Sequence, residues 1–108
     1  MDCIFCKIAN GEIPSTKVYE DDTVVAFNDL EPQAPTHILV IPKKHITSAA
    51  DINEENSGVI AHIFEVIAKI AKDQNMSDGF RVVNNCGDSA GQTVKHIHFH
   101  FMSGRDFT

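Results

Sequence analysis

The segment 96–101 constrains the fold of this chain more than any other, because histidines alternate there with large apolar residues. Successive side chains of a β-strand point to opposite faces, so a strand here places His96, His98 and His100 on one face. The apolar residues between them share the other face, which belongs in a core. Burial does not explain the histidine face, and an exposed sheet face would more naturally carry Thr, Lys or Glu. We therefore expect a sheet with a row of histidines available for chemistry.

The rest of the chain predicts an α+β fold. Runs typical of strands, separated by turn residues, lie at 17–20, 24–28, 36–41, 80–84 and 93–102. The main helix is expected to begin after Asn53, a suitable N-cap, and to carry an apolar stripe from Ile60 to Ala71. A shorter helix is expected near Ile4–Asn10. With 108 residues the chain fits one core. We expect a single domain over residues 1–108, with a mostly antiparallel sheet of about five strands and one main helix.

Charge and hydropathy exclude several classes of protein. Nine basic against fifteen acidic residues give a net charge of −6, with no basic cluster, which disfavours nucleic acid as a partner. No apolar run approaches the ~20 residues that span a bilayer, so no membrane partner is expected. The first residues lack the pattern of a signal peptide, so we expect a cytoplasmic protein.

Cys3 and Cys6 form a Cys-x-x-Cys pair, which suggests either metal ligands or a redox pair. At ~3.3 Å per residue, the first and last histidines of the row lie about 13 Å apart, too far to share one zinc ion. A zinc site would take only a histidine at one end of the row and complete itself with the two cysteines and His45. Such a closed Cys2His2 set is structural and would fix the N-terminal segment to the sheet.

The loop before the histidine segment, residues 85–92, is rich in small and polar residues. Gly87 and Gly91 allow backbone N–H groups to approach an anion, and Thr93 adds a hydroxyl donor. Alone, this stretch could be an ordinary connection between strands. Beside a row of histidines, it predicts a phosphate site next to a nucleophile or general acid.

Together these motifs resemble the histidine triad family. Residues 96–102 match its His-x-His-x-His-x-x signature with apolar residues between the histidines. Residues 29–45, Asn85 and the segment 91–94 are similar, in the same order, to the purine nucleoside phosphoramidate hydrolase branch. The resemblance implies a homodimer whose sheet continues across the two-fold axis.

The resemblance also implies roles for individual residues. His98 matches the nucleophile that attacks phosphorus and forms a nucleotidyl-histidine, a task that suits a neutral imidazole. His100 and His37 match residues that contact phosphate oxygens and hold the nucleophile in its working tautomer. Asp29 matches the carboxylate that binds both ribose hydroxyls. The remaining phosphate and leaving-group contacts are expected from Asn85, Gly91, Gln92 and Thr93.

An apolar slot for the purine ring is implied as well, although the same side chains could equally belong to the core. Its members are Ile4, Phe5, Ile8, Phe27 and Leu30. Zinc-carrying members of the family imply that His96 joins Cys3, Cys6 and His45 in a structural zinc site.

The sequence thus predicts an enzyme that cleaves the P–N bond of purine nucleoside monophosphate amides. Two alternatives remain open. One is hydrolysis of diadenosine polyphosphates, the chemistry of another branch of the family. The other is a non-catalytic module that binds purine nucleotides. The sequence does not distinguish adenine from guanine.

Overall fold

The computed structural model describes residues 3–108 and confirms the α+β fold. Its five strands are β1 (Lys17–Glu20), β2 (Val24–Asn28), β3 (Thr36–Pro42), β4 (Arg81–Val83) and β5 (Phe99–Ser103). They form one sheet in the order β1-β2-β3-β5-β4, and every neighbouring pair is antiparallel. The helices are α1 (Ile4–Ala9) and α2 (Ser57–Asp73), with short 3-10 turns η1 (Ala49–Asp51) and η2 (Asp88–Ala90).

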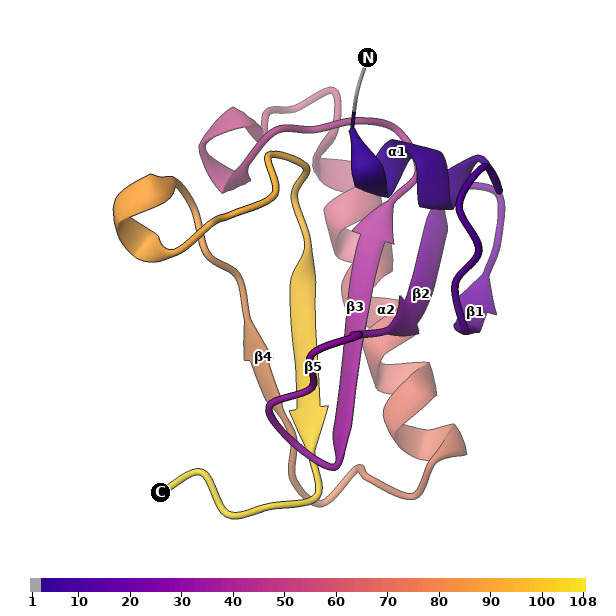
Figure 1. The fold of residues 1–108 in the computed structure, drawn as a ribbon, viewed down its shortest axis with the longest axis vertical. Helices are drawn as coiled ribbons and strands as arrows, with labels where there is room; N and C mark the ends of the chain where they lie inside the picture. The colour runs from indigo at the N-terminus through magenta and orange to yellow at the C-terminus, as the bar shows by residue number, and fades with distance from the viewer. Residues whose placement is uncertain (1–2) are drawn as a thin grey trace.

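The sheet is covered unequally on its two faces. In Figure 1, α2 lies behind the sheet, while α1 crosses one end of it on the other side. Alternate residues of β3 separate the two layers: Ile38 and Val40 pack with α2, and Leu39 and Ile41 pack with α1. Because α1 has only six residues, part of its face of the sheet stays open.

The main helix begins later than the sequence predicts. Asn53 does not cap it; the Asn53 side chain instead accepts the N–H groups of Glu55 and Asn56 and closes a separate turn. The helix then starts at Ser57 and buries Ile63, Val66, Ile67, Ile70 and Ala71 against the sheet. No helix among residues 3–108 combines the length and apolar character needed to cross a membrane.

The last strand is also shorter than expected, since the ladder of β5 starts only at Phe99. Val40 is the last residue of β3 paired with it, and Pro42 further along has no N–H to donate. The segment before Phe99 is held differently, by a bond from the Ile97 N–H to the Ile46 carbonyl. The predicted alternation nevertheless holds, because Ile97, Phe99 and Phe101 all lie in the core under α2.

Candidate functional site

A cavity of about 790 Å³ opens on the face of the sheet that α1 leaves partly uncovered. The α1 helix forms one wall, the loop after β2 forms another, and residues of β2, β3, β5 and β4 form the floor. Most of the site residues expected from the sequence line it. They are Ile4, Phe5, Ile8, Phe27, Asp29, Leu30, Asn85, Gly91, Thr93, His98 and His100.

Two residues expected in the site, His37 and Gln92, do not line the cavity but lie buried next to it. His37 is buried below it and contacts His100. Gln92 is buried as well, and its amide braces the loop: it accepts the Gly87 N–H and donates to the Thr47 and Val94 carbonyls. Leu30, by contrast, lines the cavity with 97% of its surface exposed.

His98 is buried, and one of its ring nitrogens is fixed by the main chain. Its Nδ1 lies 2.8 Å from the carbonyl oxygen of His96. A carbonyl can only accept, so Nδ1 carries a proton, and in the neutral ring the lone pair is on Nε2. The Phe5 ring meets the imidazole edge-on, with 5.1 Å between ring centroids. The result is an oriented imidazole with a nucleophilic nitrogen on a residue that lines the cavity.

His37 and His100 form a second oriented pair. The Gln33 N–H donates to Nδ1 of His37 at 3.0 Å, which leaves the proton of the neutral ring on Nε2. That nitrogen lies 2.9 Å from Nδ1 of His100, so His100 accepts there and carries its own proton on Nε2. The chain of bonds leaves an N–H donor on a ring that lines the cavity.

Burial keeps both rings of this pair neutral. Burial lowers the pKa of His37, and the nearby Asp29 carboxylate opposes that change only in part. Burial, followed by the neighbouring His98 and His37, lowers the pKa of His100 to about 4. At neutral pH the pair therefore acts through hydrogen bonds between neutral rings.

Asp29 occupies the start of the loop after β2. Its Oδ1 accepts the Glu31 N–H at 2.9 Å, and its Oδ2 lies 3.4 Å from Nε2 of His37. The carboxylate is thus held in a fixed orientation at the wall of the cavity, where it still has lone pairs to accept hydroxyl groups.

A second cluster lies beside the cavity, where Cys3, Cys6, His45 and His96 each direct one ligand atom to a common point. All four atoms lie within 4.8 Å of one another. The two Nδ1 atoms are 3.2 Å apart, and three of the four sulfur-to-nitrogen distances are 3.3–3.5 Å. Tetrahedral zinc with Zn–N near 2.05 Å and Zn–S near 2.3 Å needs about 3.4 Å between nitrogens and about 3.6 Å between nitrogen and sulfur.

The donor set therefore fits zinc, and the surroundings of His96 agree. Nε2 of His96 donates to the Pro42 carbonyl at 2.8 Å, which leaves Nδ1 unprotonated and turned toward the cysteines. Burial lowers the pKa of His96, which favours the neutral ring that a metal requires. With four protein ligands the site is closed, so it has no open position for a substrate.

Comparison with known proteins decides the family. The sequence matches the family described as "Scavenger mRNA decapping enzyme C-term binding" over residues 2–106. A histidine triad protein from Clostridium difficile, whose structure is solved, superposes with a TM-score of 0.97 at 60% identity, covering 100% of this chain and 95% of that one. The chain belongs to the histidine triad family.

Two curated relatives of this histidine triad protein bear on its chemistry. The purine nucleoside phosphoramidase of Escherichia coli strain K12 is 45% identical over 105 residues, which cover 96% of this chain and 88% of that protein. The 14 kDa zinc-binding protein of Zea mays is 48% identical over 104 residues, with 94% and 81% covered. The chain is therefore placed among the hydrolases of its family, and its Cys/His cluster is a candidate zinc site.

Some groups in the site carry no sequence signal. The carbonyl of His96 and the N–H of Gln33 orient two imidazoles, but any residue supplies such main-chain groups. Arg81 also lines the cavity and was not expected there. An exposed arginine in a strand of three residues has no pattern that would mark it.

Proposed function

We propose that this protein hydrolyses purine nucleoside phosphoramidates through a covalent nucleotidyl-His98 intermediate. The observation that carries the proposal is the orientation of the His98 ring, whose Nδ1 is bound to a carbonyl, so that the neutral ring has its lone pair on Nε2 in a residue that lines the cavity. An imidazole in this state is a nucleophile for phosphorus at neutral pH. The relative with phosphoramidase activity supports the same chemistry.

The reaction has two steps. Nε2 of His98 forms a bond to the α-phosphorus while the P–N bond breaks, and the leaving nitrogen departs as an amine with one proton from solvent. Water then attacks the same phosphorus, its oxygen stays in the nucleoside monophosphate, and the imidazole is released. The N–H of His100 stabilises charge on the phosphoryl oxygens in both steps. One water molecule is consumed overall.

The walls of the cavity suit a nucleotide. Phe5 and Phe27 lie 5.6 Å apart between ring centroids, and with Ile8 they give α1 and β2 an apolar surface for a purine ring. Asp29 at the edge of this surface would accept the ribose hydroxyls. Asn85 and Thr93 line the cavity on the side of the η2 loop, where we place the phosphate.

We further propose that the Cys/His cluster holds a structural zinc ion and that the protein is a homodimer. Zinc would fix α1 to the segments before β5 and after β3, and it would take no part in the chemistry. For the dimer, β4 offers a free edge of the sheet in the described part of the chain. Phe64 and Phe80 near this edge are 47% and 38% exposed, so a partner subunit at this edge would cover two apolar rings.

The test of the proposed function is a rapid acid quench with labelled adenosine phosphoramidate. The wild-type protein should give an acid-labile, base-stable adduct, and His98→Ala should form none and lose turnover while still binding AMP. His62→Ala, which removes a histidine on α2, is the matched control and should keep the adduct. Wild-type turnover without an adduct would replace the two-step scheme with direct attack by water.

The same assay separates the alternatives. Faster turnover of diadenosine tetraphosphate than of the phosphoramidate would favour a polyphosphate hydrolase. Binding of AMP without turnover of either compound would favour a non-catalytic nucleotide-binding module.

A further inference from the structure

Arg81 is the single lysine or arginine that lines the cavity among residues 3–108. It lies in β4, where it pairs with Met102, and Val83 pairs with His100. Since alternate residues share a face, Arg81 lies on the same face of the sheet as His100, about 6.6 Å further along the strand. The proposed reaction gives this cation no role.

The order of the strands says which part of a substrate would approach Arg81. Phe27 of β2 and Leu39 of β3 form the floor on the side of α1, His100 follows on β5, and Arg81 lies on β4 beyond it. For a nucleotide with its base over β2 and β3 and its phosphorus at β5, we expect the leaving group to continue across the sheet toward β4. In this orientation Arg81 lies on the leaving-group side of His100.

A second guanidinium group lies close to the first. Arg81 and Arg105 both stack on the Phe107 ring, at 4.7 Å and 4.3 Å from its centroid. Arg81 also donates to the Phe107 carbonyl, and Arg105 donates through Nε to the carbonyl of Gln33 in the loop after β2. These bonds hold two positive charges at one end of the cavity.

No carboxylate in the described part of the chain lies within 4 Å of either guanidinium. The nearest acidic influence is Asp106, whose pKa is lowered by its hydrogen bonds from Thr108 and, to a smaller extent, by the charge of Arg105. The adjacent Asp106 uses its Oδ1 to accept the N–H and hydroxyl of Thr108. Cation–π contacts offset part of the repulsion between the two arginines. The guanidinium donors that remain can bind an anion in bidentate fashion.

We propose that Arg81, supported by Arg105, binds an anionic group carried by the leaving amine, so that this enzyme favours phosphoramidates whose amine bears a carboxylate or a phosphate. The inference rests on the proposed function and adds the class of leaving group. Arg81 is then a specificity residue, and its planar fork matches either anion.

The experiment compares three adenosine phosphoramidates whose amines have equal length and end in a methyl, a carboxylate or a phosphate group. We expect wild-type kcat/KM to be higher for at least one anionic substrate than for the neutral one. In Arg81→Gln this ratio should fall by about tenfold to a hundredfold, since hydrogen bonds to charged groups have this strength. Arg81→Lys should retain part of it, and Arg105→Gln should lower it less.

Lys69→Gln is the matched control, because it removes one positive charge from α2 on the opposite side of the sheet and should leave the ratio unchanged. The carboxylate and phosphate arms show which anion is preferred. Equal ratios in wild type and Arg81→Gln would overturn the inference while leaving the proposed function intact, as would a loss of thermal stability without a change of ratio. No turnover of any of the three by wild type would instead overturn the proposed function.

Discussion

At the scale of single residues, the site depends on which ring nitrogen of each histidine carries a proton. Main-chain groups decide this three times: the carbonyls of Pro42 and His96 accept from His96 and His98, and the N–H of Gln33 donates to His37. One ring is thereby prepared for a metal, one for attack on phosphorus and one for donation to His100. These three histidines thus receive different chemistry from the backbone around them.

Asp29 gives the first prediction at this scale. Asp29→Ala should raise KM for ribonucleotide substrates about tenfold or more, because hydrogen bonds to a charged acceptor are worth ~1.5–3 kcal/mol. A 2′,3′-dideoxy substrate is the control, since it lacks the two hydroxyls. If the variant loses as much against the dideoxy substrate, Asp29 acts instead by orienting His37, which lies 3.4 Å from its carboxylate.

The side-chain directions in the histidine segment could be predicted from the sequence. They alternate even in the part of the segment that does not form a regular strand. His96 and His98 lie before the ladder of β5, yet Ile97 and Phe99 still enter the core and turn the histidines the other way. The positions of main-chain donors and acceptors could not be predicted, since they depend on tertiary structure. The brace formed by Gln92 is a case of the same kind, because its partners Gly87 and Thr47 come from two loops.

At the scale of elements, the predicted hairpin is confirmed with the bounds of β1 and β2 at residues 17–20 and 24–28. Asp21 explains this accuracy, since its Oδ1 accepts the N–H groups of Thr23 and Val24 and fixes the turn locally. The predicted start of α2 is wrong by three residues because Asn53 can cap either a helix or a tight turn. Local sequence does not choose between these two uses.

The proposed zinc ion should affect substrate binding indirectly, by holding α1 in place. Phe5 lies between the two cysteines of the cluster and contacts both Phe27 and His98. Loss of the metal should therefore release the wall of the purine slot. We expect Cys3→Ser, or removal of zinc by a chelator, to lower Tm by about 10 °C or more and to weaken binding of AMP.

Metal analysis, thermal unfolding and calorimetric titration with AMP check this prediction. Cys86→Ser is the matched control, because Cys86 lies outside the cluster and should change neither quantity. Zinc bound at about one ion per chain in wild type and absent from Cys3→Ser is the expected result. Unchanged AMP affinity after complete loss of zinc would mean that α1 stays in place without the metal.

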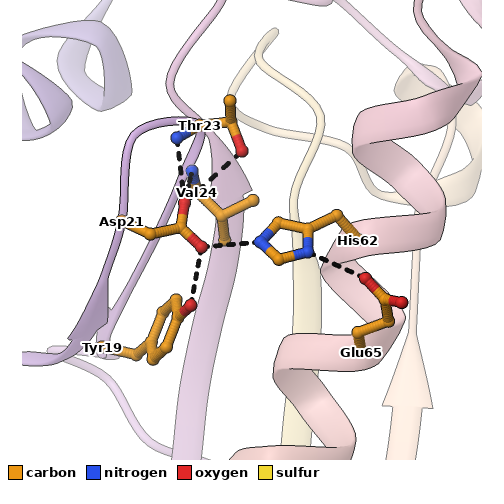
Figure 2. Close-up of polar contacts among 6 residues, drawn as sticks. All are labelled: Tyr19, Asp21, Thr23, Val24, His62 and Glu65. Atoms are coloured by element: carbon orange, nitrogen blue, oxygen red, sulfur yellow. Dashed lines mark hydrogen bonds and ion pairs between the residues drawn. The ribbon is translucent and has the colours of Figure 1, made fainter.

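A polar network joins α2 to the hairpin (Figure 2). Nε2 of His62 lies 2.6 Å from Oδ2 of Asp21, which also accepts the Tyr19 hydroxyl, and Nδ1 of His62 lies 2.9 Å from Glu65. Hydrogen bonds to Asp21 and then Glu65 raise the pKa of His62. Burial raises the pKa of Asp21, but the hydrogen bonds from Tyr19, His62 and the turn outweigh it and hold that pKa well below its usual range.

The network makes stability depend on pH. Because the folded-state pKa of His62 is raised, the folded protein binds the proton more tightly, and its contribution is fully present below the unfolded pKa of ~6.5. This contribution is lost as the pH rises through the raised folded value. We expect His62→Gln to lower the free energy of unfolding by up to ~1 kcal/mol at pH 6 and by less above the folded pKa, as for other partly exposed ion pairs.

Urea unfolding of both proteins at a series of pH values measures the difference. Only the difference between the two proteins isolates His62, because the lowered pKa values of His37, His96 and His100 act in the opposite sense. Those three make the protein less stable as the pH falls below ~6.5. A difference that does not change with pH would show that His62 acts through packing.

At the scale of the whole molecule, the two faces of the sheet have separate tasks. The layer under α2 holds the apolar core, and the opposite layer is divided between α1 and the cavity. The chain can leave the histidine face open because α2 alone covers the other face. The alternation of residues in the sequence predicts this division. It does not predict that Arg81 lines the cavity, because the position of Arg81 follows from the order of β5 and β4 in the sheet.

The last prediction concerns the edge of that sheet formed by β4. Phe64 of α2 stacks against Phe99 at 5.5 Å, and Phe80 just before β4 stacks against Phe101 at 5.0 Å, so both rings lie on the α2 side close to β4. A second copy that pairs its own β4 with this edge would cover the unpaired backbone groups and both rings at once. Light scattering at micromolar concentration should then give twice the mass of one chain. Phe64→Glu should shift the mass toward a single chain, because a charge at a half-exposed position is tolerated in a monomer but not in an apolar interface. Lys69→Glu, on the exposed side of the same helix, should leave the dimer intact, and a wild-type mass of one chain would exclude this arrangement.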